Sequence, residues 1–248
     1  MELHVIGTGS SGNAYILRAG NRALLLDAGL PFRTILRAVD GWKTLDGCLI
    51  THEHQDHIKA AADVAKMGVQ TYMSEGTLGA MDKNGCLTAL NAVQMLSPFA
   101  VGEFTVMAFE TQHDAAQPCG WLIRYRPTGE TVLYATDTYY LKYTFPGVDY
   151  WIIECNYVDE IIDAQQEAGT LTDKLRSRLK KSHLSLRRLL DVLRANDLTR
   201  AKAIVLIHLS NERSDERAMV AAVKEVTGLE EVHAAVEGQR IPLNQFPF

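Results

Sequence analysis

The chain has 248 residues, of which 47% are hydrophobic, and a net charge of −5, which does not indicate a nucleic-acid binder. Its length allows a full core, as one large domain or as two fused halves, and because no Pro-, Ser- or Gly-rich linker or close repeat divides it, we predict a single domain over residues 1–248. The first residues lack the basic region of a leader, and no apolar run approaches the roughly 20 residues of a membrane span, so we expect a cytoplasmic protein with no membrane partner.

The first motif is glycine-rich and follows a short strand: Gly7-Thr8-Gly9-Ser10-Ser11-Gly12. Its spacing is that of a dinucleotide-binding loop, but such a loop must open a helix, and residues 13–18 and 22–27 have the pattern of two strands instead. We therefore reject a dinucleotide site. A Gly/Ser loop with available backbone N–H groups can also cradle a phosphate. The side chains that we expect to donate to that phosphate are those of Ser10, Ser11 and Asn13.

A histidine-rich hexapeptide, His52-Glu53-His54-Gln55-Asp56-His57, follows a predicted helix over residues 31–40. The apolar run 47–51 leads into it and residues 58–65 follow with helical spacing, so it lies on a strand-to-helix turn. On extended backbone His52 and His54 point to one side. Three imidazoles and a carboxylate suit zinc or another divalent first-row metal, and two ions sharing these donors would leave room for a substrate. The alternative is a polar, solvated loop that happens to be rich in histidine.

Three further candidate ligands follow predicted strands: His113, Asp137 and His208. A lone His or Asp past a strand is usually a turn residue, so position alone does not identify them as ligands. The predicted strands of this part of the chain cover residues 69–73, 104–109, 120–126, 131–136, 150–155, 203–207, 231–236 and 239–243. The predicted helices cover residues 75–83, 159–168, 186–195 and 214–227.

Residues 174–200 form a basic stretch that contains nine Lys and Arg and two Asp, a net charge of +7. Both a solvated helix face and a surface that tracks a phosphate backbone have this composition. For the second case, we expect Arg176, Arg178 and Lys180 to contact phosphates. Few aromatic side chains lie in the stretch, so base stacking there is not indicated.

The hexapeptide has the form His-x-His-x-Asp-His after an apolar strand and resembles the signature of the metallo-β-lactamase fold superfamily. The resemblance implies an α/β fold, a four-layered αββα sandwich, with a site for two metal ions. Asp27, which ends an apolar strand, would support the metal loop without binding metal. The ligands that the resemblance implies are His52, His54 and His113 on one ion, Asp56, His57 and His208 on the other, and Asp137 as the bridge.

Such a pair of ions implies catalysis by a metal-bridging hydroxide, which Asp56 can orient, and no covalent enzyme intermediate. Zinc is the metal we expect, and manganese or iron suits the same donors. The zinc-protease motif His-Glu-x-x-His is excluded because position 56 is Asp.

The same resemblance narrows the substrate class. Lactam-cleaving members commonly have Cys where this chain has Asp137, which argues against antibiotic hydrolysis. Glyoxalase II shares the seven ligands and is the main alternative, as a thioester hydrolase, although its basic C-terminal helical part has no evident counterpart here. Two segments, Ser182-His183-Leu184-Ser185 and His208-Leu209-Ser210, are similar to segments of tRNase Z. The chain also resembles the YycJ (WalJ) family across nearly its whole length, in the segments Gly9–Ala14, Thr51–His54, His113-Asp114 and Ala135–Thr138.

Members of that family are described as 5′-to-3′ DNA exonucleases, so the resemblance implies a phosphodiesterase that acts on DNA ends. His183 would donate a proton to the leaving oxygen or hold the scissile phosphate; alternatively, it caps its helix alongside Ser182. A non-catalytic nucleic-acid-binding module is a third hypothesis, but all seven ligand positions are filled. About 70 residues separate Asp137 from His208, which leaves no room for a β-CASP domain, and the exosite arm of tRNase Z is not evident.

Overall fold

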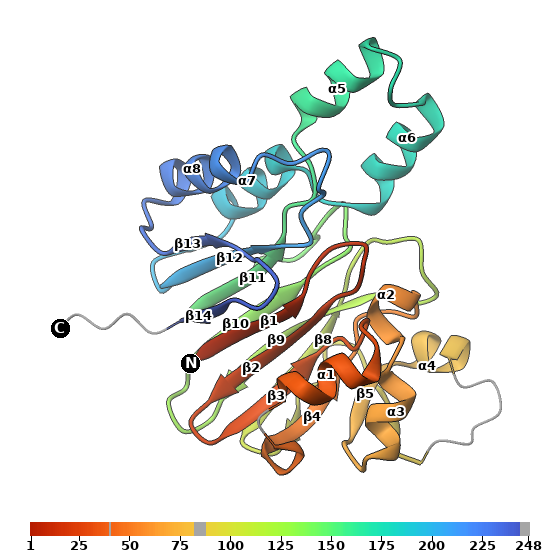
Figure 1. Cartoon of the computed structure of the whole chain (residues 1–248). Helices are drawn as coiled ribbons and strands as arrows, with labels where there is room; N and C mark the ends of the chain where they lie inside the picture. Colours follow the sequence, from red (N-terminus) through yellow and green to blue (C-terminus); the bar gives the residue numbers. More distant parts are fainter. Residues whose placement is uncertain (40, 82–87, 244–248) are drawn as a thin grey trace. The chain divides into compact units, whose positions relative to one another are not determined.

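A computed structural model describes residues 1–39, 41–81 and 88–243, and the chain divides into two compact units (Figure 1). Unit 1 comprises Met1–Glu110, Ala115–Thr131 and Val236–Phe248, and unit 2 comprises Thr111–Asp114 and Val132–Ala235. The strands of unit 1 are β1 (Glu2–Gly7), β2 (Ala14–Ala19), β3 (Arg22–Leu26), β4 (Leu45–Leu49), β5 (Thr71–Ser74), β6 (Leu90–Val93), β7 (Phe99–Val101), β8 (Phe104–Glu110), β9 (Cys119–Tyr125) and β14 (Arg240–Pro242). Its helices are α1 (Phe32–Ala38), α2 (Gln55–Ile58), α3 (Ala61–Lys66) and α4 (Glu75–Met81), with a 3₁₀ turn, η1, over Trp42–Thr44.

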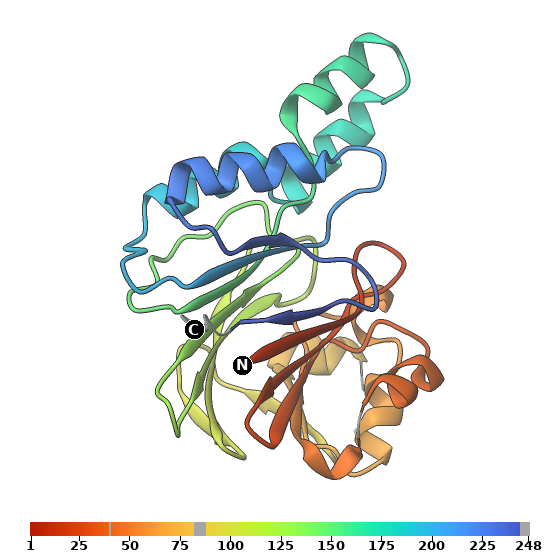
Figure 2. The ribbon, with the colours of Figure 1, turned by 60° about the vertical axis from the view of Figure 1, so that its left-hand side comes forward.

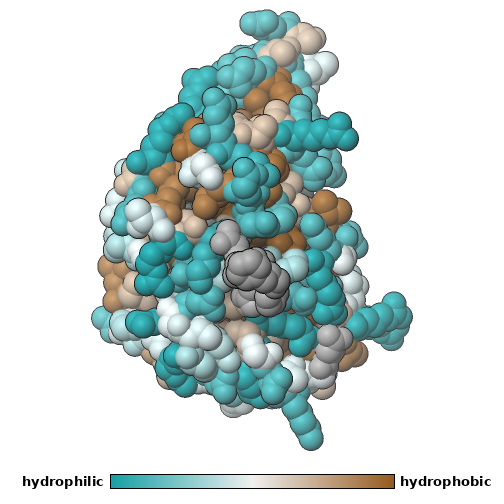
Figure 3. Space-filling view, turned by 90° about the vertical axis from the view of Figure 1, so that its left-hand side faces the viewer, coloured by the Kyte–Doolittle hydropathy of each residue, from teal (hydrophilic) through white to brown (hydrophobic). Residues whose placement is uncertain are grey.

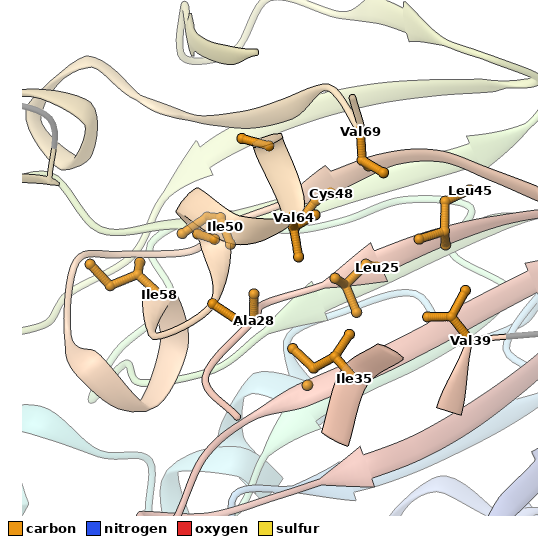
Figure 4. Packing of buried hydrophobic residues seen from close by; sticks show 14 of the residues in the cluster. Leu25, Ala28, Ile35, Val39, Leu45, Cys48, Ile50, Ile58, Val64 and Val69 are labelled. Atoms are coloured by element: carbon orange, nitrogen blue, oxygen red, sulfur yellow. The ribbon is translucent and has the colours of Figure 1, made fainter. Parts of the chain in front are cut away.

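The main sheet of unit 1 has the strand order β14-β1-β2-β3-β4-β5-β6. It begins as an antiparallel meander and becomes parallel from β3 to β6. On one face, apolar side chains of α1 and α3 pack against the sheet, and Figure 4 shows Ile35 and Val64 beside Leu25 and Cys48. Such burial suits the sequence of β3, in which Ala23-Leu24-Leu25-Leu26 form a continuous apolar run in place of alternation.

The other face of this sheet is covered by the antiparallel strands β7, β8 and β9. The Phe99 ring lies 5.2 Å from that of Tyr72 and 6.5 Å from that of Trp121, and the Trp121 indole N–H donates to the Ile50 carbonyl at 3.2 Å. Unit 1 is therefore built of a helical layer, the main sheet and a second layer of strands.

Unit 2 has four parallel strands, in the order β13-β12-β11-β10, and four helices. The strands are β10 (Thr131–Ala135), β11 (Tyr150–Glu154), β12 (Ala203–Ile207) and β13 (Val232–Ala234), and the helices are α5 (Asp159–Glu167), α6 (Asp173–Ser182), α7 (Leu186–Arg194) and α8 (Glu216–Thr227). Every residue of β11 and β12 is buried. The apolar faces of α7 and α8 bury Leu193 and Val223 on one side of these strands.

Helices α5 and α6 form a separate pair within unit 2 (Figure 2). They share a small apolar cluster of Tyr157, Ile162 and Leu171, against which Leu179 packs. The Arg176 guanidinium on α6 also pairs with the Asp163 carboxylate on α5. The basic residues of α6 therefore lie on a small helical hairpin with its own apolar cluster.

Most predicted elements are confirmed to within a few residues. The predicted continuous helix over residues 58–65 is wrong at Ala60, because the Ala60 amide donates to the Ala28 carbonyl at 2.8 Å and so interrupts the helical ladder between α2 and α3. Strand β6 and helix α6 were not predicted. The predicted ends at Asp40 and at residues 82–85 lie outside the described residues. The single-domain organisation stays a prediction.

No helix within the described ranges is long and apolar enough to cross a membrane. On the face that Figure 3 shows, hydrophilic side chains are interspersed with small hydrophobic groups.

Candidate metal centre

The hexapeptide of unit 1 follows β4 and extends into α2, and it supplies one group of potential metal donors: His52, His54, Asp56 and His57. Nε2 of His52 lies 3.2 Å from Nδ1 of His54. Two nitrogens bound to one tetrahedral zinc ion, each at about 2.0–2.1 Å, would be roughly 3.3 Å apart. The spacing of these two imidazoles therefore suits chelation of a single ion.

A buried carboxylate holds His57 in a defined orientation. The His57 Nδ1–H donates to Asp27 Oδ2 at 2.8 Å, and both side chains are fully buried. Asp27 also accepts from the backbone N–H of Thr51 at 2.8 Å and from its hydroxyl at 3.0 Å. With the proton on Nδ1, Nε2 keeps its lone pair for a metal, and Asp56 Oδ2 lies 3.7 Å from it. This geometry suits the supporting role predicted for Asp27.

Backbone contacts fix the hexapeptide against the end of β3. The Asn13 and Ala28 amides donate to the carbonyls of Asp56 and His57, each at 2.7 Å. At Gly29 an added Cβ would lie 1.6 Å from the Asp56 carbonyl oxygen, so only glycine allows this approach.

The glycine-rich loop differs from the phosphate cradle that we predicted. The Asn13 side chain is buried, and its amide binds Gly9 N–H and C=O at 3.0 and 3.1 Å and lies 3.2 Å from His57 Nε2. It orders the loop and the histidine, and a phosphate could reach it only by breaking these bonds. Ser10 and Ser11 are exposed, and their contact with phosphate stays a prediction.

Unit 2 supplies a second group of donors, which follow β10 and β12 or lie on adjoining segments: His113, Asp137, His183 and His208. Asp137 is central to the group. Its Oδ2 lies 3.6 Å from His113 Nε2 and 4.0 Å from His183 Nδ1, and its Oδ1 lies 3.5 Å from His208 Nδ1. The carboxyl ends of parallel strands are where open α/β sheets gather their functional residues.

Strained backbone marks the predicted metal-binding and supporting residues. Four non-glycine residues in the described ranges have positive φ, and three of them are Asp27 (55°), Asp137 (47°) and His208 (56°). Asp27 and His208 directly follow β3 and β12, and Asp137 lies two residues after the end of β10. The left-handed conformation costs a non-glycine residue roughly 1–2 kcal/mol, and such strain tends to persist where function requires it.

Glu154, the last residue of β11, joins the donors of unit 2 and was missed in the sequence. Its fully buried carboxylate accepts from His183 Nδ1 at 2.7 Å, His208 Nδ1 at 3.0 Å, and the amides of Thr138 and Leu184 at 2.9 and 3.1 Å. Burial alone would raise the pKa of Glu154, but the charge of His183 and the bonds from both histidines outweigh it and hold the pKa below its usual value. A carboxylate that ends a wholly apolar strand was the available signal, since acids are almost never fully buried without partners.

Two further contacts orient the histidines of unit 2. The His113 Nδ1–H donates to the Ser182 carbonyl at 2.9 Å, which leaves Nε2 towards Asp137. Burial lowers the pKa of His113, although the Asp137 charge opposes the shift, so the ring is neutral at pH 7, as a metal ligand must be. His183 does not cap the following helix, because the N-cap of α7 is Ser185, whose hydroxyl accepts from the Arg188 amide. It is instead the C-cap residue of α6, directly after Ser182, and its backbone N–H donates to the Leu179 carbonyl at 3.0 Å.

The basic residues predicted to contact phosphate do not share one environment. A recess of about 630 Å³ in unit 2 is lined by Arg178, Lys180, Lys181 and Arg188, and His113 lies in its wall. Arg176 is not among its lining residues, since its guanidinium is turned to Asp163. The recess thus joins four cations to a predicted metal ligand, and Arg176 stabilises the α5–α6 pair.

The family of the chain follows from its likeness to known proteins. A family model described as "Beta-lactamase superfamily domain" matches residues 22–209, a span that includes all seven predicted ligands. The chain belongs to this superfamily. It is 32% identical over 224 residues to Exodeoxyribonuclease WalJ of Streptococcus pneumoniae strain D39, and the match covers 85% of this chain and 82% of that protein. To Exodeoxyribonuclease YycJ of Bacillus anthracis it is 29% identical over 179 residues, 65% and 66% of the two chains.

Solved structures agree on the fold of this superfamily member. The metallo-β-lactamase fold protein YhfI from Bacillus subtilis matches with a TM-score of 0.71 at 19% identity, over 97% of this chain and 99% of that one. The short form of human tRNase Z matches with a TM-score of 0.63 at 18% identity, over 99% and 100%. The predicted metallo-β-lactamase fold is therefore confirmed, and the protein is a metal-dependent hydrolase.

Proposed function

We propose that the protein is a dinuclear metal-dependent phosphodiesterase that degrades DNA from its ends, in the 5′-to-3′ direction. In this proposal the seven ligands that the family resemblance implies form one centre. His52, His54 and His113 hold one ion, Asp56, His57 and His208 hold the other, and Asp137 bridges them. Two ions bound there would supply a hydroxide near neutral pH and neutralise charge on the phosphoryl oxygens. The donors are nitrogen and oxygen atoms only, a set that zinc, manganese and iron all accept.

The observation that carries the choice of substrate is the basic recess beside His113. Arg178, Lys180, Lys181 and Arg188 face a single acidic residue there, Asp114. A phosphodiester chain needs such cations along its backbone, and affinity for nucleic acid arises mainly from these contacts. A neutral thioester has no comparable need. The names of the relatives from S. pneumoniae and B. anthracis point the same way.

His183 is suited to act on the leaving group. Its side chain is 19% exposed, and Glu154 binds Nδ1. That bond keeps the proton-bearing Nδ1 inside and leaves Nε2 as the atom that would deliver a proton to the leaving oxygen. Asp56, 29% exposed, is the carboxylate that we propose orients the attacking water.

The test is metal-dependent digestion of 5′-labelled single- and double-stranded DNA beside a panel of thioesters. We expect DNA cleavage that EDTA abolishes and that His54→Ala removes. His233→Ala is the matched control, because His233 lies on β13 in an ion pair with Glu231 and should leave activity unchanged. Thioester turnover without DNA cleavage would transfer the assignment to a glyoxalase II-like hydrolase. DNA binding with neither activity would favour a non-catalytic binding module.

The recess is tested by the salt dependence of DNA binding. Each phosphate contact adds about 0.7–0.9 to the slope of log K against log salt concentration, so the double variant Arg178→Gln/Lys181→Gln should lower the slope by about 1.4–1.8. Lys174→Gln/Arg187→Gln removes the same charge from exposed positions outside the recess and should change the slope little. Equal effects of the two double variants would reject the role of the recess.

A further inference from the structure

A second cavity of unit 2, of about 460 Å³, lies between the segment 139–144 and helix α7. Three tyrosines line it, Tyr139, Tyr140 and Tyr143, and Val192 and the Arg188 side chain line it from α7. We call it the tyrosine pocket. Its volume falls in the range of small-molecule sites, in which apolar walls carry a few polar groups.

The pocket presents an exposed aromatic ring on a fixed backbone. Tyr140 is 55% exposed, the highest fraction among the large hydrophobic side chains that lie exposed in the described ranges. Its carbonyl accepts from the Thr138 hydroxyl at 2.7 Å, and the Tyr139 amide donates to the Gln112 carbonyl at 3.1 Å. Because the backbone on either side of the ring is already ordered, the ring offers a flat apolar face at little entropic cost on binding.

Arg188 joins the tyrosine pocket to the basic recess. Its Nη1 donates to the Tyr139 carbonyl at 3.0 Å and to the Lys180 carbonyl at 2.8 Å, and its guanidinium lies 5.6 Å from the centre of the Tyr139 ring. Tyr139 and Arg188 line both cavities. A ligand that extends from the basic recess into the tyrosine pocket would contact cations in the recess and aromatic rings in the pocket. Tyr139, which lines both cavities, is two residues after Asp137 in the chain.

We propose that the tyrosine pocket binds an unpaired nucleobase of the DNA strand whose phosphates lie in the basic recess, by stacking the base on Tyr140. This proposal rests on the proposed function and adds a base-binding subsite to it. A base has the flat aromatic face and the linked anion that this pair of cavities complements. Stacking does not distinguish the four bases, so the pocket selects a single-stranded end without selecting a sequence.

The first test uses binding alone, so it does not depend on catalysis. In EDTA, a short single strand with one 2-aminopurine, moved through successive positions from the 5′ end, is titrated with protein. We expect quenching at one position. Tyr140→Ala should abolish it and weaken binding about 5- to 150-fold, whereas Tyr140→Phe should preserve it. Met67→Ala, which removes a 51% exposed side chain from unit 1, is the control.

The second test is cleavage of strands that carry an abasic nucleotide at the position that was quenched. Tyr140→Ala should raise KM for the intact strand and leave KM for the abasic strand unchanged, because the ring has no base to stack on. Quenching that persists in Tyr140→Ala, or equal losses on both strands, would overturn the pocket. Cleavage without Tyr140-dependent quenching would refute the base-binding role of the pocket and leave the phosphodiesterase proposal intact. Tyr140-dependent quenching without any cleavage would support the pocket and refute the phosphodiesterase.

Discussion

Glu154→Gln tests how the donors of unit 2 are held. The carboxylate accepts four hydrogen bonds, from the amides of Thr138 and Leu184 through Oε2 and from His183 and His208 through Oε1. A glutamine of the same shape has one accepting oxygen and one donating NH₂. If its oxygen serves the two amides, its NH₂ faces two imidazole N–H groups.

The structure allows two responses, and both are measurable. If both imidazoles keep the proton on Nδ1, two buried donors lose their acceptor, at about 1–3 kcal/mol each, or about 2–6 kcal/mol together. For a chain of this size, roughly 2–4 °C accompany each kcal/mol, so the Tm should fall by at least about 4 °C. If the protons move to Nε2 instead, stability is kept, but Nε2 of His208, a proposed metal ligand, then carries a proton and is blocked. Metal affinity should then fall about 10- to 100-fold.

The assay is thermal unfolding in EDTA, followed by metal titration of the same samples. Glu167→Gln, which makes the same charge change on an exposed face of α5, should behave like the wild type in both. A Glu154→Gln protein with unchanged Tm and unchanged metal affinity would refute the role given to this carboxylate.

Two further outcomes follow from burial and close approach. Gly29→Ala should lower both Tm and metal content, since the added Cβ would overlap the Asp56 carbonyl. The control is Gly79→Ala in α4, where a Cβ would meet no other atom, so this variant should be more stable by roughly 0.5–1 kcal/mol. Unchanged Tm and metal content in Gly29→Ala would contradict the packing of the metal loop. Burial raises the pKa of three thiols, so iodoacetamide at pH 8 should leave them unmodified until the protein is unfolded. Peptide mass mapping measures the labelling, and labelled thiols in the folded protein would contradict this expectation. These thiols are Cys48, Cys119 and Cys155.

Much of the fold could be predicted from the sequence because the strands have local patterns, whereas the roles of the candidate ligands come from the family resemblance and stay a prediction. Apolar runs mark the strands, and the donors sit where those runs end, as at Ala203–Ile207 before His208. The break at Ala60 could not be predicted in this way, because its cause is a bond to Ala28, a residue on another element.

The supporting contacts could not be predicted because their partners lie far apart in the sequence. Glu154 gathers groups from three segments, and only the folded chain brings them together. Similarly, Arg176 and Arg178 are equivalent in the sequence, but one side chain pairs with Asp163 and the other lines the recess. The tyrosine pocket could not be predicted for the same reason, because its three tyrosines precede the basic stretch by more than thirty residues in the sequence.

The central proposal is that the seven candidate ligands hold two ions in one centre. Electron paramagnetic resonance of the manganese-loaded protein measures this directly, because two Mn²⁺ ions about 3.5–4 Å apart are spin-coupled. We predict a coupled spectrum that both His54→Ala and His208→Ala abolish and that His233→Ala retains. A spectrum of isolated Mn²⁺ in the wild-type protein, or coupling that survives the loss of either ligand, would contradict the account.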